Sequence, residues 1–282
     1  MSEVKTNINW YPGHMAKARR QMEEQLKMVD IVIELRDARM PLASANPMLE
    51  ELTKNKARLI ILNKSDKADS KENQLWVKHF ERAILTDSAN ENITNKVVNE
   101  VKDILKAKLE KAKARGIRNK SLRAMVVGIP NVGKSTFINN VVKKKMAKTE
   151  NRPGVTKSLQ WIRINDDLEL LDTPGVLWPK LDDQNKAIIM ALLGSINDII
   201  LDQEELVLYG LEYIKKEYPG LLNKRYDVDE TSSDLIEAIG LSKKWLKSEG
   251  EVDRERAIKM ILTDIRSDKI GRITFEKHES VE

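Results

Sequence analysis

The sequence predicts an α/β protein in which a three-layer domain with a largely parallel sheet precedes a small all-α domain. Up to about residue 175, short runs rich in Ile and Val alternate with amphipathic stretches. This alternation is typical of parallel strands joined by helices that cover both faces of the sheet. Beyond Trp178 the apolar residues recur with helical periodicity instead. We therefore expect one domain over residues 1–178 and a second over residues 179–282.

The expected strands of the first domain are short apolar runs that alternate with helical patterns. A turn sequence, "NDD", separates the last two runs and predicts an antiparallel hairpin at the edge of the sheet. In chain order the strands are Asp30–Leu35, Ala57–Asn63, Arg82–Thr86, Arg123–Gly128, Leu159–Ile164 and Leu168–Asp172. The helices expected around them are Met15–Met28, Pro47–Asn55, Lys71–Phe80 and Asn92–Arg115.

Acidic residues mark helix starts in the second domain. "DQEEL", from Asp202, has the D-x-x-E form of a capping box, in which the first side chain accepts a bond from a free backbone N–H. "TSSDLIEAI" and "VDRERAIKMIL" open in a similar way. These starts predict several short helices between about Leu181 and Arg266.

Composition excludes several classes of function. The 282 residues include no cysteine and three histidines, so disulfides and thiolate zinc sites are excluded and a His-rich metal site is not expected. The formal charge of +5 favours a polyanionic partner, RNA or a membrane surface, although an ordinary soluble protein fits the charge equally well. Because no apolar run is long enough to span a bilayer and the start lacks an apolar signal region, we expect a cytoplasmic protein.

A phosphate-binding loop is the strongest motif. "GIPNVGKS" (Gly128–Ser135) fits G-x-x-x-x-G-K-[ST] and lies between the strand "RAMVV" and the helix "STFINNVV". In such a loop the backbone N–H groups surround phosphate oxygens, Lys134 reaches the β- and γ-phosphates, and Ser135 binds Mg²⁺. The residues expected to contact the nucleotide here are Asn131, Val132, Gly133, Lys134, Ser135 and Thr136.

Two segments after this loop predict contacts to the γ-phosphate. "DTPG" ends an apolar strand, and there Asp172 is expected to hold Mg²⁺ while the Gly175 N–H contacts the γ-phosphate. "NRPGVTK" supplies Thr156, which is expected to bind Mg²⁺ and the γ-phosphate, unless it is an ordinary loop threonine.

"LNKSD" predicts that the base is guanine. Asp66 can accept hydrogen bonds from guanine N1–H and the exocyclic amine, whereas adenine has an acceptor at N1 and no such amine. We expect the Asn63 side chain to address the O6/N7 edge and the Lys64 stem to cover the ring, with Ser65 between them. The S-A loop "TDSAN" adds Asp87, Ser88 and Ala89, whose backbone N–H groups contact the base.

The order of these motifs is unusual. In a GTPase of ordinary order the guanine loop follows the phosphate loop, whereas here Asn63–Asp66 precedes Gly128–Ser135. Cutting such a protein between its third and fourth motifs and joining its old ends gives this order. Every contact survives the permutation, because places in a sheet need not follow the chain. We therefore expect a circularly permuted P-loop GTPase domain.

The chain resembles the circularly permuted GTPases of ribosome assembly, the family of bacterial ribosome biogenesis GTPase A. The segments that carry the resemblance are "NWYPGHMAKARRQ", "LRDARMPLASANP", "LNKSD", "GIPNVGKSTFIN", "NRPGVTK" and "LDTPGVLWP". The resemblance runs through nearly the whole chain. It implies hydrolysis of GTP to GDP and phosphate in late maturation of the large (50S) ribosomal subunit. It also implies that the helical domain binds ribosomal RNA (rRNA) and that the assembly intermediate stimulates hydrolysis.

The group that orients the attacking water is the point where the pattern departs from Ras-type enzymes. Those enzymes place a glutamine directly after D-x-x-G, and this chain has Val176, which cannot hydrogen-bond water. The resemblance implies His14 for this role; His14 could instead pack, cap the following helix or contact RNA. It also implies that Asn131 helps to bind K⁺ near the phosphates.

Basic stretches are the candidate RNA contacts, at Lys17–Arg20, Lys106–Arg123 and Lys143–Lys145, although each also fits a solvated helix face. In the helical domain, acidic residues interleave the candidates Lys215, Lys216, Lys243, Lys244, Lys259 and Arg266. Two other readings stay open: an RNA-binding scaffold that holds nucleotide with negligible hydrolysis, favoured by Val176, and a GTPase that acts on transfer RNA or a membrane. We expect a protein that is monomeric off the ribosome.

Overall fold

The structure is a computed structural model of the 282-residue chain and describes residues 19–20, 22–89, 91–117, 120–142, 160–172, 183–196 and 202–280. Its strands form one six-stranded sheet in the order β3-β2-β1-β4-β6-β5. All neighbours are parallel except β5, which pairs antiparallel with β6 at the edge. The strands are β1 (Ile31–Asp37), β2 (Ala57–Asn63), β3 (Ala83–Thr86), β4 (Leu122–Gly128), β5 (Gln160–Arg163) and β6 (Leu168–Asp172).

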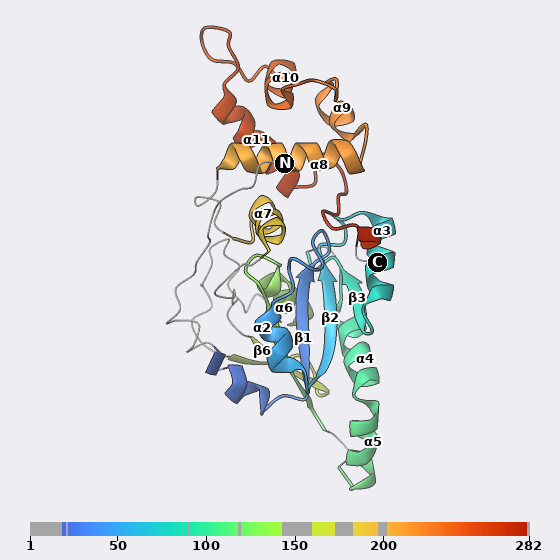
Figure 1. Cartoon of the computed structure of the whole chain (residues 1–282). Coiled ribbons are helices and arrows are strands. Elements are labelled where there is room, and N and C mark those ends of the chain that lie inside the picture. The colour runs from blue at the N-terminus through green and yellow to red at the C-terminus, as the bar shows by residue number, and fades with distance from the viewer. Residues whose placement is uncertain are drawn as a thin grey trace.

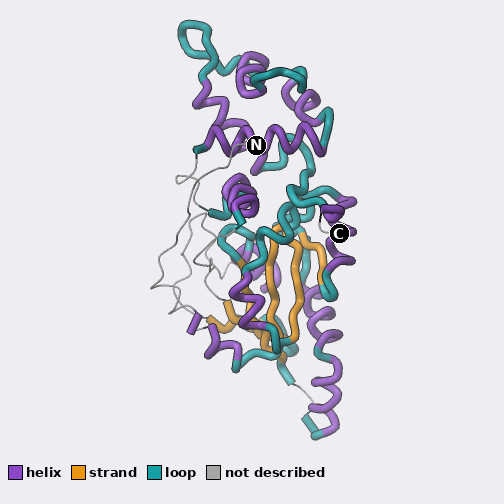
Figure 2. The backbone as a smooth tube through the Cα atoms, viewed as in Figure 1, coloured by secondary structure: helices purple, strands orange, loops and turns teal. Residues whose placement is uncertain are grey.

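Helices cover both faces of this sheet (Figures 1 and 2). One face packs against α4 (Thr94–Ile104) and α6 (Lys134–Val142), and the other against α2 (Pro47–Thr53) and α3 (Ser70–His79). All seven residues of β1 are buried, as expected of a central parallel strand. The expected α/β architecture with three layers is confirmed.

One expected helix is divided in two. Instead of a continuous helix over residues 92–115, α4 ends at Ile104 and α5 (Lys106–Ala114) begins at Lys106. The break is at Leu105, which is buried against the core, whereas most of α5 is exposed. Figure 1 shows that α5 extends past the end of the sheet.

The described part of residues 183–280 contains helices and no strand (Figure 2). The predicted starts are confirmed for three helices, because Asp202, Asp234 and Asp253 each accept a backbone N–H bond in the first turn. The helices are α7 (Gln184–Leu192), α8 (Gln203–Glu217), α9 (Leu221–Tyr226), α10 (Leu235–Ser242) and α11 (Arg254–Arg266), followed by a short 3₁₀ turn, η2 (His278–Ser280).

Residues 268–280, after α11, return to the first part of the chain. The Trp76 Nε1–H donates to Glu276 O at 3.0 Å, and the Asp69 N–H donates to Thr274 Oγ1 at 3.1 Å. The Glu276 carboxylate accepts from the N–H groups of Leu42 (2.7 Å) and Ala43 (2.9 Å). These contacts place the segment beside α3 and the loop after β1 (Figure 1).

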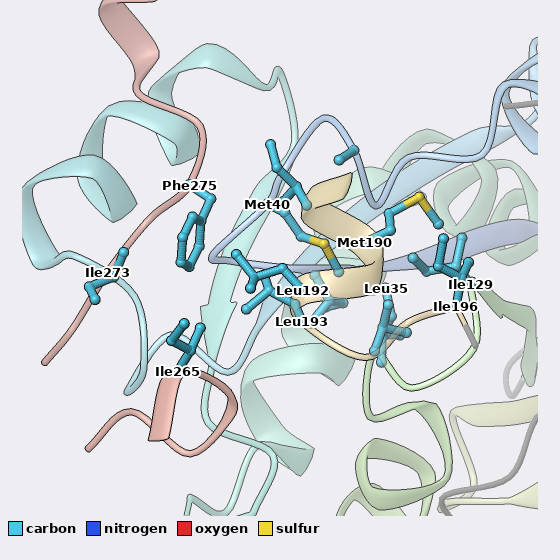
Figure 3. Close-up of a cluster of buried hydrophobic side chains, with 14 of the residues drawn as sticks. Leu35, Met40, Ile129, Met190, Leu192, Leu193, Ile196, Ile265, Ile273 and Phe275 are labelled. Carbon is cyan, nitrogen blue, oxygen red and sulfur yellow. The ribbon is translucent and has the colours of Figure 1, made fainter. Parts of the chain in front are cut away.

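An apolar seam joins the sheet to the helical part. Figure 3 shows Leu35 and Met40 from the β1 region facing Met190 and Leu193 of α7 and its end, with Phe275 beside them. All five side chains are buried. The helical part therefore packs directly on the carboxyl edge of the sheet, where loops of parallel sheets carry ligand sites.

Candidate nucleotide site

Three loops that the sequence assigned to the nucleotide leave the sheet at one edge. Parallel strands β2, β3 and β4 end at Asn63, Thr86 and Gly128, and β1 lies between β2 and β4. The ends are in register, with Asp37 opposite Asn63 and Leu35 opposite Gly128. The guanine loop, the S-A loop and the phosphate loop are thus neighbours, although the chain visits the phosphate loop last.

The Asn63 side chain ties these three loops together. Its Nδ2 donates to Val132 O of the phosphate loop at 2.8 Å. Its Oδ1 accepts from Thr86 Oγ1 and from the Ser88 N–H, both at 3.2 Å. Because an amide nitrogen carries two hydrogens, the group has one more donor to offer to the base. The contacts add a role that the sequence reading did not foresee, in which Asn63 holds the site together.

The phosphate loop has the backbone that its motif requires. Gly133 has φ +92°, and an added Cβ there would overlap Asn63 Nδ2. Asn131 has φ +62° without being glycine. Helix α6 begins at Lys134, which is buried, and Ser135 and Thr136 follow half-buried in its first turn. The loop and helix start therefore direct N–H groups to one place, a geometry that favours anions.

Lys64, with φ +58°, reaches from the guanine loop back to the phosphate loop. Its Nζ donates to Asn131 O at 2.7 Å and to Asp37 Oδ2 at 2.9 Å. Ser65 is placed by its N–H bond to Thr86 O at 3.2 Å. From α3, Asn73 Nδ2 donates to Ser65 O at 2.9 Å. The guanine loop is thus fixed from two sides.

Two acidic residues, Asp66 and Asp87, lie in the loops that follow β2 and β3, where the base is expected. Burial, together with the nearby Asp87 carboxylate, raises the pKa of Asp66 above its ordinary value. Asp87 Oδ1 accepts the Ala89 N–H at 3.1 Å and so shapes the S-A loop. The buried Ser88 Oγ has no hydrogen-bond partner among the described residues. The guanine loop and the S-A loop thus bring two acidic residues together at this edge of the sheet.

Three expected γ-phosphate and water contacts, and the valine that stands in place of a glutamine, cannot be placed. His14, Thr156, Gly175 and the neighbouring Val176 lie outside the described residues. Asp172 is described as the last residue of β6, next to β4, and its side chain is outside the description. Within the described ranges, no group of three or more His, Cys, Asp or Glu side chains could hold a metal ion by itself. Ser135 is therefore the described residue that fits Mg²⁺ bound to a nucleotide.

Contacts to the helical part were missed by sequence reasoning. Asn131 Nδ2 donates to Gly194 O, just after α7, at 2.6 Å. Arg266, at the end of α11, donates from Nε to Leu192 O at 3.0 Å and from Nη2 to Ala191 O at 2.8 Å. The Arg266 bonds add donors at the C-terminus of α7, where the last carbonyls have no partner from a following helical turn; Ala191 O also accepts the Gly194 N–H at 3.0 Å. No short-range pattern reveals them, because the partners are distant in sequence.

A buried ion pair at the end of β1 was also missed. Arg39 donates to both carboxylate oxygens of Asp37, from Nε at 3.0 Å and from Nη2 at 2.8 Å. Its Nη1 donates to Arg266 O at 3.2 Å. The signal was present in "LRDAR", since charged residues directly after a buried parallel strand lie at the ligand edge of the sheet.

The sheet, the phosphate loop after β4 and the guanine loop after β2 define a P-loop GTPase whose strands are connected in permuted order. A family model described as "50S ribosome-binding GTPase" matches residues 123–237. Ribosome biogenesis GTPase A of Bacillus pumilus is 45% identical over 97% of this chain and 99% of its own length. The chain therefore belongs to the ribosome biogenesis GTPase A family and is a GTP hydrolase.

More distant relatives agree with this assignment. Ribosome biogenesis GTPase A of Thermotoga maritima is 29% identical over 97% of this chain and 96% of its own length. The crystal structure of GNP-bound YlqF from T. maritima has a TM-score of 0.65 and 27% identity, covering 93% of this chain and 98% of that one. A GDP-bound structure of the same protein gives a TM-score of 0.66. No helix within the described ranges is both long and apolar enough to cross a membrane.

Proposed function

We propose that this chain is a GTP-dependent switch in late assembly of the large (50S) ribosomal subunit, acting in the cytoplasm on rRNA within an assembly intermediate that stimulates hydrolysis. The observation that carries the nucleotide part is the Asn63 amide, which bonds the phosphate loop at Val132 and the S-A loop at Ser88. The names of the relatives support the ribosomal part, since they are ribosome biogenesis GTPases.

Guanine recognition would divide among Asp66, Asn63, Lys64 and the S-A loop. The ionised Asp66 carboxylate accepts bonds from N1–H and the 2-amino group, and Asn63 donates to the N7 side. The Lys64 stem covers the ring. The S-A loop borders the base, and its Ser88 and Ala89 N–H groups, which donate to Asn63 Oδ1 and Asp87 Oδ1 here, would exchange one of these bonds to serve O6. Substitution Asp66→Asn tests this assignment, because an amide can donate to the 2-carbonyl of xanthine. We expect the variant to lose GTP and gain xanthosine triphosphate binding; unchanged preference for GTP would refute the assignment.

The phosphates would lie on the loop of residues 131–136. Its N–H groups and the Lys134 ammonium stabilise charge on the β- and γ-oxygens, and Ser135, with Asp172 and Thr156, would hold Mg²⁺. The ion supplies positive charge against the oxygens that become more negative as the bond to the γ-phosphate breaks. Gly175 N–H would add a donor to the γ-phosphate.

We assign the orientation of the attacking water to His14, because Val176 has no hydrogen-bonding group. An imidazole nitrogen can accept a hydrogen bond from the water, and this bond directs a lone pair of the water oxygen toward the phosphorus. Particle-stimulated turnover of His14→Ala tests this role. We expect kcat to fall with GTP affinity unchanged, and an unchanged kcat would refute it.

We assign to Asn131 a place beside a K⁺ ion close to the phosphates. The bond from its Nδ2 to Gly194 O orients the amide so that Oδ1 is available as a ligand. Such an ion would supply the charge that an arginine finger supplies elsewhere, worth about 10³–10⁵ in rate. Equal turnover in K⁺ and Na⁺ buffers would contradict this role.

We divide the chain into a GTPase domain over 1–178 and a helical RNA-binding domain over 179–282, with residues 268–280 packed back on the first. The decisive experiment is co-sedimentation with large-subunit assembly intermediates in GDP and in a non-hydrolysable GTP analogue. We expect stronger binding with the analogue and faster GTP turnover on the particle. Binding without measurable turnover would favour the scaffold alternative instead.

A further inference from the structure

We propose that Asp37 is a positioning residue of the guanine site, which holds the Lys64 ammonium so that the Lys64 stem lies flat over the base. This inference rests on the proposed reading of guanine by residues 63–66. It gives a role to "LRDAR", the sequence at the end of β1 that the nucleotide motifs leave unexplained.

Lys64 is held at both ends of its side chain. Its backbone, at φ +58°, follows the last residue of β2, and its Nζ bonds Asp37 Oδ2 at 2.9 Å and Asn131 O at 2.7 Å. The four methylene groups between these points are therefore stretched from the guanine loop to the phosphate loop. Since a free lysine loses substantial rotamer entropy when it is ordered, fixing the ammonium in advance lowers the cost of covering the base.

Asp37 is built to remain ionised in the interior. Its side chain is fully buried, yet its Oδ1 and Oδ2 accept three bonds from Arg39: those from Nε and Nη2, and one from the Arg39 backbone N–H at 3.0 Å. Burial alone would raise the pKa of Asp37, but Arg39 and Lys64 together hold it well below its ordinary value. Asp37 is therefore a charged acceptor for the Lys64 ammonium, whose own pKa is lowered by burial.

Arg39 connects this pair to the helical part. Its Nη1 donates to Arg266 O at 3.2 Å, and its carbonyl accepts the Phe275 N–H at 2.7 Å. Close by, Met40 faces α7 in the apolar seam of Figure 3. The helical part therefore helps to position Arg39, and through it the carboxylate that bonds Lys64.

The chain contains a comparable ion pair that serves only the helical part. Arg225 donates from Nε (3.0 Å) and Nη2 (2.8 Å) to Asp264 Oδ2, and the Asp264 side chain is 1% exposed. This pair lies in α9 and α11, and the hydrogen bonds of its two side chains within the described residues all stay in the helical part. It is the matched control for the cost of breaking a buried pair.

The test measures the affinity and dissociation rate of a fluorescent GDP analogue for Asp37→Asn. We expect affinity to fall by about tenfold or more, mainly through faster dissociation, because the bound base loses its cover. Asp264→Asn should lower thermal stability to a similar degree and leave affinity unchanged. Equal loss of affinity in both variants would overturn the proposal, since the effect would then follow stability.

A double-mutant cycle shows whether Asp37 acts through Lys64. Lys64→Met keeps an unbranched stem and removes the ammonium. In that background, Asp37→Asn should change affinity by less than about twofold, because the residues share one interaction. Losses that simply add would overturn the proposal. If Asp37→Asn does not fold, Asp37→Glu keeps the charge but displaces it, and its smaller loss should vanish in the same background.

The base specificity of Asp66 separates this inference from the proposed function. If Asp66→Asn fails to exchange guanine for xanthine, the proposed reading of the base fails, whatever Asp37 does. If the exchange occurs, Asp37→Asn should weaken xanthine binding to that variant by the same factor as guanine binding to the parent protein, because the stem covers the ring face that both bases share. An unchanged affinity would refute the role of Asp37 alone.

Discussion

The Asn63 amide nitrogen occupies the space that a Cβ on Gly133 would need, so that the guanine loop and the phosphate loop meet without a gap. The same nitrogen bonds the carbonyl of Val132, the residue before that glycine, at 2.8 Å. The two motifs are distant in sequence, yet Asn63 of one can take this position only because residue 133 of the other is glycine. Adding one methyl group, as in Gly133→Ala, tests this requirement.

Substitution Gly133→Ala should abolish tight nucleotide binding. The added Cβ displaces the Asn63 amide, and the residue must also adopt φ +92°, at a cost of about 1–2 kcal/mol for an L-residue. We expect GDP affinity to fall by at least about tenfold in a titration with a fluorescent analogue. Gly116→Ala is the control, because Gly116 has φ +83° and open space around it. Equal effects of the two substitutions would show that backbone strain alone is responsible.

GDP affinity should weaken as the pH falls, and the loss should begin at a pH above the range in which an ordinary aspartate titrates. Only the ionised Asp66 accepts both bonds from guanine, and its pKa is raised by burial and by Asp87. Protonation of Asp66 therefore competes with binding, and affinity is lost as pH falls through that raised pKa. Asp87→Asn should move the midpoint to lower pH, whereas the exposed Asp166→Asn should not. Identical pH profiles for all three proteins would contradict this assignment.

Substitution Glu276→Ala should loosen the C-terminal segment. It leaves the N–H groups of Leu42 and Ala43 without their acceptor, and each loss costs about 1–3 kcal/mol if the groups stay dry. We expect a lower free energy of unfolding in urea and faster proteolysis within residues 268–280. The neighbouring exposed Glu279→Ala should behave like the parent protein. Unchanged proteolysis of Glu276→Ala would show that the apolar contacts of Phe275 suffice to hold the segment.

Substitution Arg266→Ala should affect the phosphate loop from a distance. It removes two donors from Ala191 O and Leu192 O at the end of α7, and Gly194 O, two residues further on, accepts from Asn131 of the phosphate loop. We expect faster amide hydrogen exchange in the phosphate loop in addition to a loss of stability. Lys259→Ala, on the exposed side of the same helix, is the control. If only the helical part exchanged faster, α7 would not transmit the change.

Much of the fold follows from local pattern. The apolar runs predict the strands to within about two residues, because a parallel strand is buried on both faces, and β2 and β6 have the predicted bounds. Capping aspartates predict the starts of α8, α10 and α11. The break at Leu105 could not be predicted, since it depends on the tertiary packing that buries Leu105 in the core.

The candidate site also contains some contacts that the sequence predicts and others that it does not. Asn63, Lys64 and Gly133 belong to local motifs, so their neighbourhood is predictable once the strands are placed. The bond from Arg39 to Arg266 and the bond from Asn131 to Gly194 join segments that no spacing rule relates. Their partners are main-chain carbonyls, which leave no signature in the sequence. Such contacts emerge only when the helical part is docked.

The packing of residues 268–280 on the first part of the chain also affects folding during translation. The guanine loop and α3 are translated early, but Trp76, Asp69 and the loop after β1 receive their partners from residues made after nearly everything else. While residues 268–280 are still inside the ribosomal exit tunnel, α3 and the loop after β1 lack these partners, so this side of the sheet is completed only after α11 has been translated.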